Sequence, residues 1–166
     1  MEILIASDHA GFEVKKIVLE WLTDIEKIEF GFSNTLYEKT IHNIDKQFND
    51  FTTKDLGCHS ADSVDYPDYA NRLSAELLTN PKNVGILICG TGIGMSMAAN
   101  KFLHIRAALC CDVDTAVMTR KHNNANVLCI GARNNDKQKI ISIIEAFLTT
   151  SFEEGRHLRR IEKFSR

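Results

Sequence analysis

One run of six residues, Val84–Cys89, contains no polar side chain and is followed at once by the turn Gly90-Thr91-Gly92-Ile93-Gly94. A strand that is apolar on both faces is typical of a parallel sheet covered by helices on each side. Four further runs are expected to form strands, the last of them less clearly. They are Ile3–Ser7, Ile105–Cys110, Asn126–Ile130 and Thr52–Gly57.

The segments between these runs have helical periodicity. Apolar residues recur every three or four positions in Val14–Leu22 and Lys139–Leu148, and Pro67 sits where a helix over Asp68–Leu78 would begin. Strands that alternate with helices predict an α/β fold, a three-layer αβα, doubly wound (Rossmann-like) parallel sheet of five strands with a C-terminal helix.

The 166 residues are expected to form a single domain, residues 1–166. Residues 25–51 are longer than a strand–helix connection needs, and their polar part, from Ser33 to Asp50, has little apolar periodicity. We interpret them as an insertion on the surface, with a lid or a partner contact as the alternative.

Composition excludes several classes of function. A formal charge of −2 argues against nucleic-acid or membrane-surface partners. The chain opens on an apolar run without a basic region, so no signal peptide is expected, and no apolar stretch is long enough to span a membrane. The five cysteines show no CxxC spacing, and a reducing cytoplasm is the simplest interpretation.

Ligands of open parallel sheets bind at the carboxyl ends of the strands. Glycines and polar residues gather at four such ends, and the turn after Cys89 is the most informative, because its amides suit an anion. Its spacing is neither a dinucleotide fingerprint nor a P-loop. A cysteine at this place is usually a packed residue, but the neighbouring amides would also favour a thiolate.

The histidines and C-terminal arginines leave alternatives open. His9 and His122 could be ordinary surface or core groups, and no His/Cys spacing matches a metal site, so no metal is assigned. Arg156 and Arg160 would share one face of a helix. They form either a solvated basic end or a clamp on a phosphate group.

Together these stretches resemble the type B ribose-5-phosphate isomerases, whose family also includes the galactose-6-phosphate isomerase subunits. The resemblance covers most of the chain outside residues 25–51. The motifs that carry it are Ser7-Asp8-His9-Ala10-Gly11-Phe12, Asp65-Tyr66-Pro67-Asp68-Tyr69-Ala70, Gly85 to Gly94, Ala98-Ala99-Asn100-Lys101, Ile105-Arg106-Ala107, His122-Asn123 and Gly155-Arg156-His157.

The resemblance implies an isomerase that moves a proton between two carbons of an opened sugar. Cys89 matches the base, and Thr91 matches a residue that assists it. A related branch uses a glutamate at the position of Met95, so this chain is similar to the cysteine type. His122 matches the acid–base group that opens the ring.

The other matched residues would bind a phosphorylated pentose. The amides of Gly90, Gly92 and Gly94 would hold the enediolate charge, Asn123 would contact substrate oxygens, and Asp8 and Tyr66 would line the sugar. The phosphate contacts would be His9, Arg133, Arg156 and Arg160. The resemblance further implies no cofactor, and a homodimer or homotetramer with shared active sites.

Two other functions remain open at this stage. The same chemistry could act on a six-carbon sugar phosphate, allose 6-phosphate or galactose 6-phosphate, because sequence does not measure pocket length. A non-catalytic phosphosugar sensor on the same fold is the alternative from another class, since fold does not determine function. A sensor would need neither a base nor a ring-opening histidine.

Overall fold

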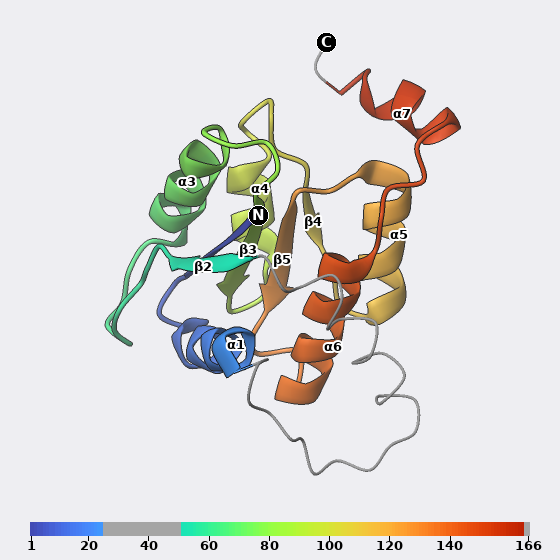
Figure 1. Ribbon diagram of the computed structural model, residues 1–166. Coiled ribbons are helices and arrows are strands. Elements are labelled where there is room, and N and C mark those ends of the chain that lie inside the picture. Colours follow the sequence, from blue (N-terminus) through green and yellow to red (C-terminus); the bar gives the residue numbers. More distant parts are fainter. Residues whose placement is uncertain (25–50, 165–166) are drawn as a thin grey trace, which may run out of the picture.

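The computed structural model describes residues 1–24 and 51–164. Within them, five parallel strands form one sheet in the order β2-β1-β3-β5-β4 (Figure 1). The strands are β1 (Glu2–Ser7), β2 (Thr52–Asp55), β3 (Val84–Cys89), β4 (Ala107–Leu109) and β5 (Val127–Gly131). The predicted three-layer α/β fold is confirmed. The predicted insertion at residues 25–51 lies outside the described residues except for Phe51.

Helices cover both faces of the sheet. They are α1 (Phe12–Asp24), α3 (Tyr66–Leu77), α4 (Ile93–Ala99), α5 (Val113–Asn123) and α6 (Lys137–Thr149). A further helix, α7 (Arg156–Ile161), packs against α5. On one face, α1, α5 and α6 pack against side chains such as Ile5, Ile86 and Ile130. On the other face, α3 and α4 pack against Leu4 and Leu87. Neighbouring strand residues therefore serve opposite cores, which explains why β3 has no polar side chain.

Two strands are shorter than predicted: β2 ends before the predicted Gly57, and β4 begins after the predicted Ile105. β2 stops at Asp55, because its carboxylate accepts a hydrogen bond from Gly57 N at 2.9 Å and Gly57 has a φ of 99°, which turns the chain. β4 begins only at Ala107. Preceding it, Ile105 N donates to Phe102 O at 2.9 Å and closes a turn.

The sheet changes direction of winding between β1 and β3. From β1 the chain reaches β2 on one side, whereas β3, β5 and β4 lie on the other. The carboxyl ends of β1 and β3 thus border the switch point where ligands of such sheets bind. None of the described helices has the length and apolar character needed to cross a membrane.

Candidate active site

Cys89 ends β3 at the switch point and is buried. The chain turns back over its side chain, and Cys89 Sγ accepts a hydrogen bond from Gly92 N at 3.1 Å. Gly92 precedes α4 with a φ of 78°, a left-handed conformation that glycine adopts without strain. Thr91 Oγ1 accepts from Ile93 N at 3.4 Å in the same turn. The sulfur therefore already has the hydrogen-bond donor that a negatively charged sulfur would use.

Arg133 and Tyr66 lie against the glycine turn. A β-carbon built on Gly90 would be 3.2 Å from the guanidinium carbon of Arg133, and one on Gly94 would be 2.6 Å from Cζ of Tyr66. The backbone of Arg133 is held beside the turn, because its main-chain N–H donates to the carbonyl of Gly90 at 3.1 Å. Both side chains approach the turn closely because the glycines leave room for them.

Asp8 and His9 follow β1 on the other side of the switch point. Asp8 is buried, and its Oδ1 accepts from Gly11 N at 3.0 Å. His9 Nδ1 accepts from Val64 N at 3.2 Å. In a neutral ring this acceptor places the proton on Nε2, which is then a donor. The contact also ties the loop after β1 to the segment that leads into Tyr66.

One edge of the sheet thus collects most of the predicted site. The residues gathered at the carboxyl ends of the strands are Asp8, His9, Tyr66, Cys89, Gly90, Thr91, Gly92, Gly94 and Arg133. Within one region they offer the sulfur of Cys89, backbone N–H groups that can donate hydrogen bonds, and the positively charged guanidinium group of Arg133. Such a set can bind an anionic substrate and move a proton on it.

The opposite edge of the sheet, where the strands begin, carries the remaining predicted residues, His122, Asn123, Arg156 and Arg160. After β4, α5 runs back along the sheet, and its last residues precede β5 at the amino end of the strands (Figure 1). β5 is five residues long, so about 16 Å of strand separates the two edges. A single chain therefore does not bring His122 and Cys89 together.

The second group has a defined geometry of its own. The rings of His122 and His157 are stacked, with centroids 4.2 Å apart and planes 4° from parallel. Glu153 Oε2 lies 3.8 Å from His122 Nε2 and 3.9 Å from His157 Nε2. Lys121 Nζ is 3.4 Å from the other carboxylate oxygen. Arg156 Nε donates to His157 Nε2 at 3.3 Å.

Burial lowers the pKa of His157, and electrostatic interactions with His122, Arg156 and Arg160 lower it further, while Glu153 acts in the opposite direction. The buried ring is consequently neutral at neutral pH. Sequence reasoning assigned no role to Glu153 or His157. No spacing rule relates either of them to residue 122, and only their place beside the C-terminal arginines was a signal.

His122, Glu153 and His157 also bring three potential metal ligands within 4.8 Å of one another. The contacts favour a different arrangement. His157 Nε2 is already an acceptor for Arg156, and the two rings lie face to face rather than converging on one point. Lys121 adds a positive charge beside the carboxylate. We assign no metal to this cluster, and the absence of a cofactor stays a prediction.

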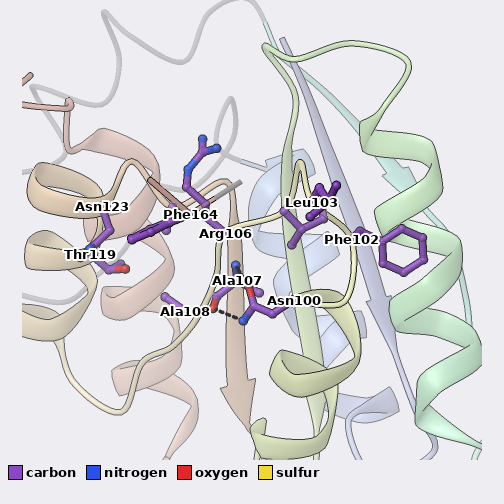
Figure 2. A pocket seen from close by; sticks show the side chains of 11 residues that line it. Asn100, Phe102, Leu103, Arg106, Ala107, Ala108, Thr119, Asn123 and Phe164 are labelled. Atoms are coloured by element: carbon purple, nitrogen blue, oxygen red, sulfur yellow. Dashed lines mark hydrogen bonds between the residues drawn. The ribbon is translucent and has the colours of Figure 1, made fainter. Parts of the chain in front are cut away.

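A pocket of about 340 Å³ opens beside this second group. Asn123 and Thr119 of α5 line one side, Leu103 lines the other, and Phe164 comes from the segment after α7 (Figure 2). At its floor Asn100 exchanges two hydrogen bonds with the backbone of Ala107 in the edge strand β4. Asn123 therefore faces a cavity rather than the Cys89 turn of its own chain.

Comparison with known proteins extends over nearly the whole chain. Ribose-5-phosphate isomerase B of Escherichia coli is 34% identical over 161 residues, which cover 97% of this chain and 92% of that protein. The crystal structure of a ribose 5-phosphate isomerase from Thermotoga maritima has a TM-score of 0.80 at 41% identity, covering 99% of this chain and 97% of that one.

A third similar protein is the ribose-5-phosphate isomerase B of Mycoplasma genitalium, whose structure holds ribulose 5-phosphate. It has a TM-score of 0.77 at 38% identity, covering 99% of this chain and 93% of that one. The sequence model of the Ribose/Galactose Isomerase family matches residues 35–164. The predicted resemblance is thereby confirmed, and the chain belongs to the ribose/galactose isomerase family, with type B ribose-5-phosphate isomerases among its relatives.

Proposed function

We propose that this protein interconverts D-ribose 5-phosphate and D-ribulose 5-phosphate as an aldose–ketose isomerase. The observation that carries the proposal is Cys89, whose sulfur accepts from Gly92 N at the switch point of the sheet. Membership in the isomerase family agrees with it. The reaction needs a base, donors for developing negative charge and a clamp that positions the substrate. The two edges of the sheet supply residues of all three kinds.

Cys89 is proposed as the base of the chemical step. Its thiolate removes the proton from C2 of the open-chain aldose and returns it to C1, while the hydroxyl proton passes from O2 to O1, so that the C1 aldehyde becomes a hydroxyl and C2 becomes a ketone. The enediolate between these states carries negative charge. The backbone N–H groups of Gly90, Gly92 and Gly94 are proposed to stabilise it, with Thr91 assisting the base. No net oxidation occurs, because the electrons stay within the substrate.

His122 is proposed to open the sugar ring by proton transfer, with Asn123 on the substrate oxygens. Asp8 and Tyr66 would line the sugar. The phosphate contacts would be His9, Arg133, Arg156 and Arg160. Arg133 supports this proposal because it already lies over Gly90, where its positive charge faces the turn. His9 supports it because its Nε2 is left as a donor.

We infer that the active enzyme is a homodimer, or a homotetramer built from such dimers, with active sites shared between chains. The separation of Cys89 from His122 across the sheet supports this, because one chain alone leaves each group incomplete. Exposed apolar side chains flank the edge strand β4 as well. They are Ile93 and Met97 of α4, Leu103, and Val113 and Met118 of α5. A second copy would bury them.

A cytoplasmic location is part of the proposal. All five cysteines are free thiols, and only Cys111 is exposed. A base that acts as a thiolate needs a compartment in which cysteines stay reduced.

The deciding experiment is a coupled assay for ribulose 5-phosphate formed from ribose 5-phosphate, with EDTA present. We expect turnover by the wild type and none by Cys89→Ala. Cys129→Ala is the matched control, because Cys129 is buried in the neighbouring strand and its burial raises the pKa of its thiol. The control should keep most of its activity.

Activity retained by Cys89→Ala would remove Cys89 as the base, and activity lost with EDTA would contradict the metal-free mechanism. Absence of turnover on ribose 5-phosphate would contradict the proposed substrate. Comparison of kcat/KM with allose 6-phosphate and galactose 6-phosphate then tests the six-carbon alternative. Binding of phosphosugars without any turnover would favour a sensor.

A further inference from the structure

His157 is the one buried residue of α7, and the arginines on both sides of it are exposed. Its ring lies against the last turn of α5, where it meets His122. The helix that carries Arg156 and Arg160 is therefore attached to the end of α5 largely through this imidazole.

The face of His157 restrains His122. Their rings are 4.2 Å apart and nearly parallel, and His122 is itself about one-third exposed. A side chain that is open to solvent on one face keeps considerable rotational freedom unless a neighbour covers the other face. The stack on a buried ring thus selects one plane for His122 and keeps its Nε2 edge directed toward Glu153.

The edge of His157 restrains Arg156. Arg156 Nε donates to His157 Nε2, and an arginine always carries the proton in such a contact. His157 must then hold a lone pair on Nε2 and its proton on Nδ1. Because Nε is engaged, the plane of the guanidinium group is defined and its two terminal NH₂ groups remain for a ligand.

The groups around His157 keep this acceptor available. Burial and the electrostatic influence of His122, Arg156 and Arg160 lower the pKa of His157, which favours an unprotonated Nε2 at neutral pH. Glu153 Oε2 is 3.9 Å from the same nitrogen. The negative charge of this carboxylate is offset by Lys121, whose Nζ lies 3.4 Å from Glu153 Oε1.

We propose that His157 is a positioning residue that holds the ring-opening histidine His122 and the phosphate-binding Arg156 as one unit. The inference rests on the roles proposed above for these two residues. Its physical content is that one imidazole supplies both a flat face and an edge acceptor. Phenylalanine offers only the face, and glutamine offers only the acceptor.

The test compares His157→Phe with His157→Gln in the full-length protein. In His157→Phe the stack survives, so we expect the ring-current shift of the His122 proton signals in NMR to persist. The dissociation constant of inorganic phosphate, measured by calorimetry, should rise about tenfold, as expected for the loss of one hydrogen bond to a charged group. The kcat on ribose 5-phosphate should fall less than KM rises.

His157→Gln should give the opposite pattern. Phosphate affinity stays within about twofold, since the acceptor is kept, while the His122 ring-current shift disappears. The kcat on ribose 5-phosphate should fall about tenfold. Turnover of D-erythrose 4-phosphate should change little, because its phosphorylated C4 oxygen prevents closure of a five-membered ring.

Equal losses of all these quantities in both variants would overturn the proposal, because they would show that His157 only packs α7 against α5. Unchanged phosphate affinity in His157→Phe would overturn it as well. Urea unfolding of each variant gives the folded fraction for which kinetics are corrected. Wild-type turnover in the same assay tests the proposed function separately, whereas the NMR and phosphate measurements decide the role of His157 even without turnover.

Discussion

The ring of Tyr66 lies so close to Gly94 that a β-carbon at residue 94 would be 2.6 Å from Tyr66 Cζ. Tyr66 opens α3 and Gly94 lies in the first turn of α4, so the contact joins two helices at the rim of the Cys89 turn. It makes the position of Tyr66, which we propose to line the sugar, depend on a residue that has no side chain.

Gly94→Ala is expected to displace Tyr66 and raise the KM for ribose 5-phosphate. Over-packing of this kind costs about 1–3 kcal/mol, whereas alanine in a helix otherwise stabilises by up to about 1 kcal/mol over glycine. The effect on KM should therefore vanish in a Tyr66→Ala background. Steady-state kinetics of the two single variants and the double variant check this. Additive effects in the double variant would show that the contact is not the cause.

Lys15 is buried at the start of α1, where it pairs with Asp55 and donates to the carbonyl of Cys58 at 2.7 Å. Lys15→Met leaves both partners without their cation, and we expect a loss of about 2–3 kcal/mol in the free energy of unfolding. The neighbouring Lys16 is exposed, and it contacts Glu13 at 3.2 Å and lies 5.5 Å from the centroid of the Phe12 ring. Lys16→Met should change stability by less than about 0.5 kcal/mol. Urea unfolding of both variants measures the difference, and equal losses would contradict the assigned role.

Glu145 is buried in α6, and its Oε1 has no hydrogen-bond partner among the residues that the structure describes. Burial raises the pKa of this carboxyl above its ordinary value of 4.5. A carboxyl with a raised pKa in the folded state destabilises the protein as pH rises through that pKa, because the unfolded chain releases the proton first.

Glu145→Met should therefore stabilise the protein by about 1 kcal/mol near pH 7, and its advantage should shrink toward pH 4. Thermal or urea unfolding at several pH values gives the comparison. Glu20→Met, at an exposed position of α1, serves as the control and should show no such trend. A pH-independent difference for Glu145→Met would refute the titration argument.

Asn100 takes the place of a strand partner for β4. Its Nδ2 donates to Ala107 O at 2.8 Å, and its Oδ1 accepts from Ala107 N at 2.9 Å. Asn100→Asp keeps the acceptor but faces the carbonyl with a second oxygen, and we expect a loss of about 1–2 kcal/mol in unfolding free energy.

Asn80→Asp is the matched control for this variant. Asn80 uses Oδ1 as the acceptor for Lys82 N at 3.0 Å, and aspartate retains that acceptor. The control should leave stability almost unchanged. If both variants lost the same free energy, the brace on β4 would not explain the result.

The local pattern of apolar and polar residues was sufficient to predict much of this fold. β3 has the predicted bounds, because a strand buried on both faces needs an unbroken apolar run. The residues around Cys89 could also be placed in advance, since parallel strands bring their carboxyl ends to one edge. The bounds of β2 and β4 could not, because the turn at Gly57 and the turn that Ile105 N closes with Phe102 O interrupt the predicted runs without a signal in their residue pattern.

The sequence by itself determined the family, the αβα layers and the group of residues at the carboxyl edge, because these follow from periodicity and from motifs that are continuous along the chain. Only the tertiary structure showed that His122 lies at the other edge and that His157 joins it to Arg156. α5 runs antiparallel to the strands, so residues that end it lie a full strand length from Cys89. The contacts of His122 with residues 153 and 157 depend on how helices pack over a long sequence separation, which no local pattern encodes.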